Sequence, residues 1–239
     1  MPKANDHMLV IGGTSGIGLP LAQAAHALGC KLTIAGRGGE RVAEIAKSIG
    51  SDVVGRHLDL DDAASIRAAL ADGPPIDHLV LVPIDQFMTS VKTFDVAKAN
   101  KALHVKLTGY IAVVHTVLPR LKPTSSIVLF GGLAKARPYM NSTMITVANA
   151  GIVGVMNTLA VELAPIRVNS VSPGLIGDSP KWEAAAKKGA QPFIDAFAAK
   201  TPSRRLATVA DVIHAVFFLL DNPAVNGHDL EIDGGMRLV

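Results

Sequence analysis

The sequence predicts a doubly wound α/β fold, a single domain in which a central parallel sheet of about seven strands is covered by helices on both faces. Short β-rich apolar runs alternate with longer stretches of helical period, and Gly or Asp marks many junctions. This βαβ alternation is typical of a parallel sheet covered on both faces. In addition, a glycine-rich segment follows the first run and opens the first helix. Such a segment in that position is typical of a phosphate-binding turn.

Seven apolar runs are the expected strands, and helices fill most of the gaps. The runs cover residues 7–12, 31–35, 52–57, 78–82, 126–130, 166–171 and 228–232. A long Ala/Val-rich helix is expected over 142–163, packed against the sheet or a neighbouring subunit. Residues 174–203 form a long insert after the sixth strand, which predicts a lid or substrate loop. Trp182, Phe193 and Phe197 would give this lid an apolar surface or pack within it.

Composition indicates one cytoplasmic globular domain over residues 1–239. The chain is 49% hydrophobic and 18% charged, enough for one sizeable core. The single Cys30 forms no internal disulfide, and residues 1–7 lack the apolar stretch of a signal peptide. The apolar run 212–220 is interrupted by His214 and is shorter than the ~20 residues of a membrane span, so no membrane association is expected.

Charge and histidine spacing predict no nucleic-acid partner and no metal. The formal net charge is only +3, and the Lys and Arg residues are scattered rather than grouped in a stripe. The eight histidines form no His-x-x-x-His pair.

The glycine-rich segment predicts a dinucleotide site. It runs from a strand into a helix and consists of Gly12, Gly13, Thr14, Ser15, Gly16, Ile17 and Gly18. Glycines permit a tight turn and a close approach of backbone N–H groups to a pyrophosphate, which then lies at the positive end of the helix. After the next strand, Gly36-Arg37 favours NADP over NAD, because Arg pairs with a 2′-phosphate whereas an acid would bind a free ribose hydroxyl.

Four segments in order resemble the short-chain dehydrogenase/reductase family, whose members have a Rossmann fold. The cofactor loop is similar to the family's loop, although Ile11 stands where Thr is usual. Three later segments also resemble family patterns: 57–61, 159–174 and 226–235. The resemblance implies adenine contacts from Asp59 and Leu60, and nicotinamide contacts from Pro173, Gly174 and Ile176. It also implies a homotetramer or homodimer built through the long helix and the last strand.

The reactive end departs from the family. Members use a Tyr as proton donor and a Lys four residues later that lowers its pKa. Tyr110 is followed by Val114 and Tyr139 by Thr143, so no Tyr-x-x-x-Lys exists in any register. The alignment places Ile145 at the Tyr position, Asn149 at the Lys position, Gly132 at a substrate-holding Ser position and Lys106 at the relay Asn position. Residues 81–84, Leu-Val-Pro-Ile, replace the usual Asn-Asn-Ala-Gly.

Four residues are candidate replacements for the missing acid: Lys106, Asp178, Arg137 and Tyr139, with Asp85 weaker. Lys106 would supply charge at the emptied relay position, or it is a surface helix lysine. Asp178 would donate a proton or pair with a cationic substrate, or it is a solvated loop carboxylate. Arg137 and Tyr139 lie on a loop that borders the family's substrate cavity, where such residues are as often structural.

Two functions remain open at this point. The first is an NADP(H)-dependent oxidoreductase with a non-standard active site, which reduces an activated small organic substrate such as an imine, iminium ion or enone. The second is a catalytically silent NADP-binding protein with a sensing or scaffolding role, because a working relay rarely survives loss of every member.

Overall fold

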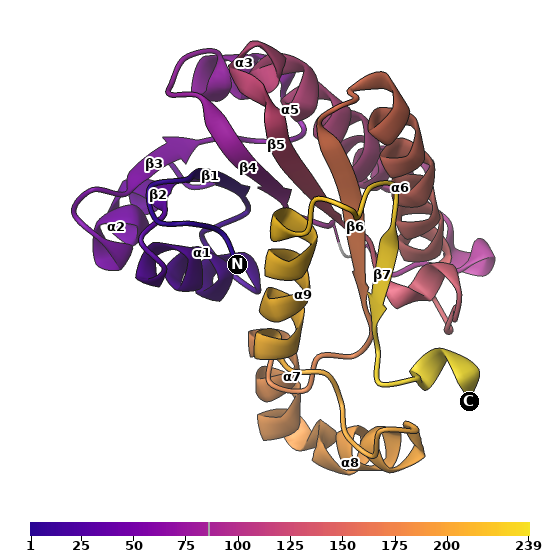
Figure 1. Cartoon of the computed structure of the whole chain (residues 1–239). Coiled ribbons are helices and arrows are strands. Elements are labelled where there is room, and N and C mark those ends of the chain that lie inside the picture. Colours follow the sequence, from indigo (N-terminus) through magenta and orange to yellow (C-terminus); the bar gives the residue numbers. More distant parts are fainter. Residues whose placement is uncertain (86) are drawn as a thin grey trace.

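The computed structural model describes residues 1–85 and 87–239. One seven-stranded sheet runs through the molecule in the order β3-β2-β1-β4-β5-β6-β7, and each neighbouring pair is parallel. The predicted doubly wound fold is therefore confirmed (Figure 1). The strands are β1 (His7–Ile11), β2 (Lys31–Gly36), β3 (Val54–His57), β4 (Ile76–Leu81), β5 (Leu121–Phe130), β6 (Arg167–Pro173) and β7 (Asp229–Ile232).

The strand limits differ most from expectation at β4 and β5. β5 begins at Leu121, five residues before the expected start, and Leu121 pairs with Ile76 ahead of a shift in register. Pro123 in this stretch argued against a strand. The irregular segment is fixed by side chains instead: Ser125 Oγ donates to the Ile76 carbonyl at 2.6 Å, and Lys122 pairs with Asp77.

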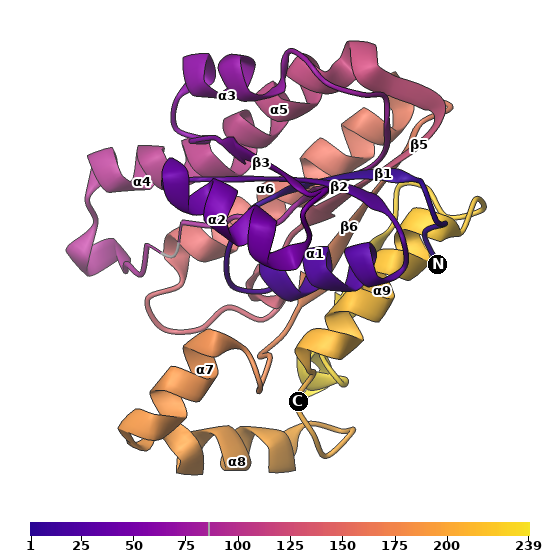
Figure 2. The same cartoon turned by 90° about the vertical axis from the view of Figure 1, so that its left-hand side faces the viewer.

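Helices cover both faces, as alternation along the buried strands requires. Met8 and Val10 of β1 contact the layer of α1 (Gly18–Ala27), α2 (Glu40–Ile49) and α9 (Val209–Asp221). Leu9 and Ile11 contact the opposite layer of α3 (Ala63–Leu70), α5 (Gly109–Val117) and α6 (Thr143–Glu162). Figure 2 shows the two layers on either side of the sheet. The remaining helical segments are α4 (Val96–Leu103), α7 (Pro180–Ala185), α8 (Gln191–Lys200), the 3₁₀ turns η1 (Val91–Thr93), η3 (Leu118–Arg120), η4 (Leu133–Lys135) and η6 (Met236–Leu238), and the π-turns η2 (His104–Thr108) and η5 (Ala186–Ala190).

Helix α6 matches the predicted long helix to within one residue at each end. Its 20 residues are long and apolar enough to cross a bilayer by length and composition. Its inward positions, among them Ile152 and Met156, are nevertheless fully packed against the sheet. This burial explains its composition as that of a core helix.

The predicted insert after β6 is mostly helical and has a small core of its own. Trp182 of α7 stacks on Phe193 of α8 with centroids 5.9 Å apart, and Phe193 lies 5.1 Å from Phe197. Leu133, Ile194, Leu206 and Met236 form the buried part of this cluster. Both cartoon views place α7 and α8 beyond the sheet, next to one end of α9 (Figures 1 and 2). Trp182 and Phe197 also pack on this buried cluster, whereas Phe193 is half exposed.

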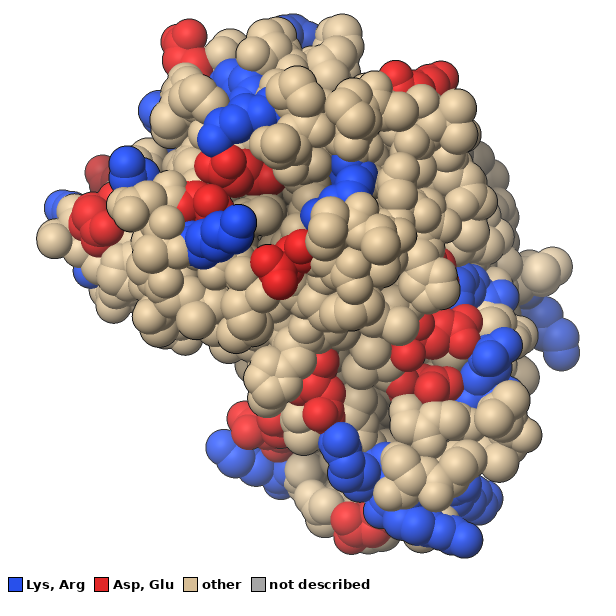
Figure 3. Space-filling view, viewed as in Figure 1, with Lys and Arg blue, Asp and Glu red and all other residues tan. Residues whose placement is uncertain are grey.

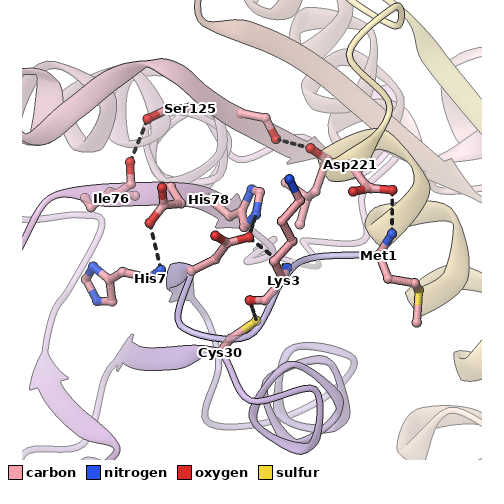
Figure 4. Close-up of polar contacts among 12 residues, drawn as sticks. Met1, Lys3, His7, Cys30, Ile76, His78, Ser125 and Asp221 are labelled. Atoms are coloured by element: carbon pink, nitrogen blue, oxygen red, sulfur yellow. Dashed lines mark hydrogen bonds and ion pairs between the residues drawn. The ribbon is translucent and has the colours of Figure 1, made fainter.

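Two buried histidines lie at the amino ends of β1 and β4, at the opposite end of these strands from the glycine-rich loop. His7 contacts the Pro75 carbonyl and Thr33 Oγ1, each at 2.9 Å. His78 contacts Asp6 at 3.1 Å through Nε2, while its Nδ1 has no partner among the described residues. Burial lowers the pKa of both rings, and for His78 the Asp6 carboxylate opposes this effect. Figure 4 shows these side chains close to Lys3 and Cys30.

The surface carries mixed charge. On the face drawn in Figure 3, Lys and Arg side chains are interspersed with Asp and Glu side chains. Ion pairs such as Lys101 with Asp61, at 3.3 Å, connect neighbouring charges.

Candidate active site at the carboxyl edge of the sheet

The glycine-rich loop joins β1 to α1 in a conformation that requires glycine. Gly12 has φ +85° and Gly16 φ +56°, both in the left-handed region that favours glycine. A β-carbon on Gly18 would lie 2.1 Å from the Gly12 carbonyl oxygen. The first turn of α1 has no side-chain cap, because Ile17 occupies the N-cap position. The loop therefore offers free backbone N–H groups at a helix N-terminus, which fits a pyrophosphate.

Arg37 lies where the sequence predicts a 2′-phosphate contact. It directly follows β2, is exposed, and forms no ion pair with any residue that the structure describes. The preceding Gly36 leaves room for Thr14 of the loop, since a β-carbon there would lie 2.6 Å from Thr14 Oγ1. The guanidinium is thus free to bind a phosphate beside the glycine-rich loop.

The predicted adenine contacts lie on the next strand connection. Leu60 is buried, and Asp59 accepts a hydrogen bond from the Asp61 amide at 3.0 Å. Asp59 also lines an open cavity of about 640 Å³ between β3 and α3, together with His57 and Ser65. Space for a ring system is therefore present beside Asp59.

The predicted nicotinamide contacts follow β6. The Gly174 amide donates to the Ile232 carbonyl at 2.9 Å, so the turn is held against β7. Ile176 is buried and forms an isolated bridge with Ala207. Pro173 and Gly174 are partly exposed at the end of the strand.

Lys106 is fully buried at the end of β4, in the π-turn η2. Its Nζ donates to the Pro83 carbonyl at 3.2 Å and to Tyr110 Oη at 3.1 Å. Burial lowers the pKa of Lys106 to about 7 and raises that of Tyr110 well above its usual value. The alternative interpretation of Lys106 as a surface helix lysine is therefore wrong. A group with this pKa exchanges a proton readily near neutral pH.

Pro83 connects Lys106 to the cofactor loop. A β-carbon on Gly12 would lie 2.8 Å from Pro83 Cγ, so the proline ring packs directly on the loop backbone. The Pro83 carbonyl accepts from Tyr110 Oη at 2.8 Å as well as from Lys106. Tyr110 was missed as part of this cluster, because we considered only a lysine four residues after it. The signal was the lysine four residues before it, on the same helical face.

Gly132, Ile145 and Asn149 come together between β5 and α6. Ile145 and Asn149 are 7% and 2% exposed on the inward side of α6. A β-carbon on Gly132 would lie 2.6 Å from Asn149 Nδ2. Gly132 and Asn149 are therefore in contact between β5 and α6, and Ile145 lies one helical turn from Asn149.

The other candidate residues have structural contacts. Asp178 is exposed, and its carboxylate accepts a hydrogen bond from the Val209 amide at 2.7 Å, at the first turn of α9. The Arg137 guanidinium lies over the Phe197 ring, 5.4 Å from the centroid. Tyr139 is 51% exposed, and among residues 1–85 and 87–239 its hydroxyl contacts Met88 Sδ alone, at 4.0 Å. Asp85 is half-buried.

Lys135 holds the segment after Gly132 in place. Its Nζ lies 2.9 Å from Asp229 and 2.6 Å from Glu231, two carboxylates of β7. Burial lowers the pKa of Lys135, but the two carboxylates outweigh it and the net pKa is raised. Sequence reasoning missed this group, because Lys135 is nearly a hundred positions from the two carboxylates.

A protein-family model described as Enoyl-(Acyl carrier protein) reductase matches residues 12–237. The cis-2,3-dihydrobiphenyl-2,3-diol dehydrogenase of Paraburkholderia xenovorans is 30% identical, with 99% of this chain and 92% of that protein covered. The chain belongs to the short-chain dehydrogenase/reductase (SDR) family. The 3-oxoacyl-[acyl-carrier-protein] reductase of Mus musculus is 28% identical over 96% of this chain and 97% of its own length. A solved short-chain dehydrogenase/reductase from Brucella melitensis is 26% identical, with a TM-score of 0.89 over 98% of this chain and 97% of that one. The predicted family is thus confirmed, and the chain is an oxidoreductase of the SDR type.

No group of three or more His, Cys, Asp or Glu side chains in the described part of the chain is arranged to hold a metal ion.

Proposed function

We propose that this SDR protein is an NADPH-dependent reductase that acts on an already electron-poor small organic acceptor. The observation that carries the proposal is the contrast at one sheet edge. The cofactor loop keeps every glycine its geometry requires, whereas the buried titratable groups beside Pro83 are Lys106 and Tyr110, of which Lys106 has its pKa lowered toward neutrality. A protein that binds the cofactor without a tyrosine acid is suited to substrates that need little protonation.

Arg37 supports NADPH over NADH. An unpaired, exposed guanidinium at the end of β2 would form charge-assisted hydrogen bonds with a 2′-phosphate. Arg37 would form no comparably strong interaction with the free 2′-hydroxyl of NADH. The glycine-rich loop would hold the pyrophosphate, and Asp59 and Leu60 would border the adenine.

Lys106 is the best-placed proton source of the four candidates. Asp178 is occupied at α9, Arg137 lies on an aromatic ring, and Tyr139 is largely in solvent. Lys106 instead lies on the carbonyl of Pro83, whose ring contacts the cofactor loop. The bound nicotinamide supplies the hydride. Lys106 would hold a proton near neutral pH, and the buried pocket around it would exclude water.

Electron-poor acceptors fit this arrangement better than simple ketones. An iminium ion, an imine or a conjugated alkene polarised by a carbonyl accepts hydride with less help from an acid. The matching family model is described as Enoyl-(Acyl carrier protein) reductase. An enoyl group is a conjugated alkene polarised by a carbonyl, the last of these substrate classes.

A second candidate function is a silent NADP-binding protein. Ile145, a buried apolar residue where the family has its acid, favours it. In that case the working property would be cofactor binding within a homotetramer or homodimer, formed through α6 and β7. Analytical ultracentrifugation tests this association, and a monomer at all concentrations would contradict it.

The test is a titration followed by a screen. NADPH and NADH are titrated into the protein while nicotinamide fluorescence is followed, and NADPH is expected to bind more tightly. Aldehydes, imines and enones are then screened for NADPH oxidation. Bound NADPH without turnover of any class would favour the silent protein, and absence of binding to either nucleotide would overturn both candidates.

A further inference from the structure

Asn149 carries a buried amide that makes no hydrogen bond with any described residue. Its side chain is 2% exposed, and its Oδ1 has no partner. Apart from His78 Nδ1 at the other end of the sheet, no other buried side-chain N or O in the described residues is unsatisfied. An unsatisfied buried polar group costs about 1–3 kcal/mol, so its retention calls for an explanation.

Gly132 and Asn149 are matched in space. Gly132 has φ 167°, an extended conformation open to any residue, so the backbone does not require glycine there. A β-carbon at this position would lie 2.6 Å from Asn149 Nδ2, so the amide would have to turn to admit a side chain there. The amide of Asn149 therefore occupies the space in which a side chain at position 132 would begin.

The resemblance to the SDR family gives position 132 to a Ser that holds the substrate carbonyl. In this chain the Ser is absent and an amide from α6 reaches the same space. An amide N–H is a donor, as a hydroxyl is, and with neither end of the amide held it is free to turn its NH₂ toward a ligand.

We propose that Asn149 donates a hydrogen bond to an oxygen atom of the substrate, and so replaces in space the donor missing at Gly132. This inference rests on the proposed reductase function and narrows its substrate class to carbonyl-activated alkenes. Reduction of such a substrate places hydride on the β-carbon, and the π electrons of the C=C bond move to the carbonyl oxygen as an enolate. The α-carbon would then take a proton from the Lys106 ammonium, solvent would return a proton to Lys106, and the cofactor would be left as NADP⁺.

The charge that develops on the enolate oxygen is what a fixed amide donor stabilises. Removal of one such donor typically lowers kcat about 10²- to 10³-fold. Its effect on binding of the ground-state substrate is smaller. An iminium ion has no lone pair on its nitrogen and cannot accept this hydrogen bond, whereas a neutral imine accepts it at nitrogen. The donor therefore favours the enone over the iminium ion.

The first experiment compares Asn149→Asp and Asn149→Ala with the wild type, and uses Asn157→Asp as the matched control, an exposed residue of the same helix. The probe is 2-cyclohexen-1-one, assayed with NADPH for turnover. Its equilibrium binding to the NADP⁺-loaded protein, which cannot reduce it, is measured by calorimetry. Both Asn149 variants should lower kcat about 100-fold or more, and weaken enone binding about 2- to 10-fold. The NADPH dissociation constant should stay within about twofold, and Asn157→Asp should change none of these.

A rescue separates a donor role from a structural one. Gly132→Ser alone forces the Asn149 amide to turn away from the new β-carbon, so enone turnover should fall below that of the wild type. The double variant Gly132→Ser/Asn149→Ala removes this contact and supplies a hydroxyl in the same space, so enone binding and turnover should recover at least tenfold over Asn149→Ala. Gly132→Ala/Asn149→Ala, which has no donor, should not recover. Equal behaviour of the two double variants would overturn the proposal.

The readouts distinguish failure of this inference from failure of the proposed function. Weaker NADPH binding in Asn149→Asp with unchanged enone binding would assign Asn149 to the cofactor and overturn the inference alone. Absence of wild-type enone binding would also overturn it, whatever the cofactor titration shows. Absence of NADPH binding would overturn the proposed function.

Discussion

The glycine-rich loop and the Gly132–Asn149 surface lie at the same edge of one sheet, but different forces determine their residues. At Gly12, Gly16 and Gly18 the backbone itself demands glycine, through positive φ or contact with a carbonyl. At Gly132 the backbone is extended, and the space beside it is occupied by the neighbouring Asn149 amide. Residues of the first kind are fixed one by one. For residues of the second kind, a change at one position alters the space left for the other.

The largest effect is expected from a β-carbon in the loop. Gly18→Ala places that carbon 2.1 Å from the Gly12 carbonyl, so the loop must open. NADPH affinity should fall at least about 100-fold, since the pyrophosphate loses its backbone donors. Fluorescence titration measures it.

The control is Gly154→Ala on the exposed side of α6, where a β-carbon meets nothing within 4 Å. This change should leave NADPH affinity alone and raise stability by about 0.5–1 kcal/mol. Normal NADPH binding by Gly18→Ala would show that the loop is not the cofactor site.

Removal of the buried charge tests the reactive end. Lys106→Met should abolish turnover yet stabilise the fold, because burial of this lysine holds its pKa near 7, below the usual 10.5. The unfolded chain keeps the proton up to the higher value, so wild-type stability rises with pH between about 7 and 10.5. The stabilisation by Lys106→Met should therefore be largest at pH 6 and smaller by about 2–3 kcal/mol at pH 9.

Urea denaturation at both pH values measures this difference. If the stabilisation by Lys106→Met did not change with pH, burial would not be what holds Lys106 neutral. Full turnover by Lys106→Met would remove it as the proton source.

The preference for NADPH over NADH should depend on one residue beside the glycine-rich loop. Arg37→Ala is expected to weaken NADPH binding about 10- to 100-fold through loss of the charge-assisted bonds, and to leave NADH binding unchanged. Arg41→Ala, an exposed arginine in the first turn of α2, is the matched control. Equal losses for the two nucleotides would show that Arg37 does not read the 2′-phosphate.

The smallest effect is expected at Asp178. A role as hydrogen-bond acceptor for the first turn of α9 and a role as proton donor predict opposite effects of Asp178→Asn on turnover. Asp178→Asn keeps an oxygen for the Val209 amide, so stability and turnover should both persist. Asp178→Ala should cost about 1 kcal/mol in the free energy of unfolding. Thermal unfolding and NADPH oxidation are the measurements. Loss of turnover in the Asn variant with full stability would restore Asp178 as a proton donor.

The sequence predicted the loop better than the reactive end for a physical reason. A strand, a glycine turn and a helix are local, so Gly12, Gly16 and Gly18 were recognisable from their spacing. The burial of Lys106 depends on β4, Pro83 and Tyr110, which are brought together only by the fold. Asn149 was identified as a departure, but its contact with Gly132 joins two separate elements. The early start of β5 was missed because tertiary pairing overrode the signal of Pro123.

The two buried histidines at the amino ends of β1 and β4 make acid unfolding a proton-consuming event. Both rings have a lowered pKa when folded, so the unfolded chain binds more protons just below pH 6.5. The stability that depends on neutral His7 and His78 is complete above pH 6.5 and declines as the pH falls. Potentiometric unfolding of wild type against His7→Gln and His78→Gln should therefore show fewer protons taken up by each variant.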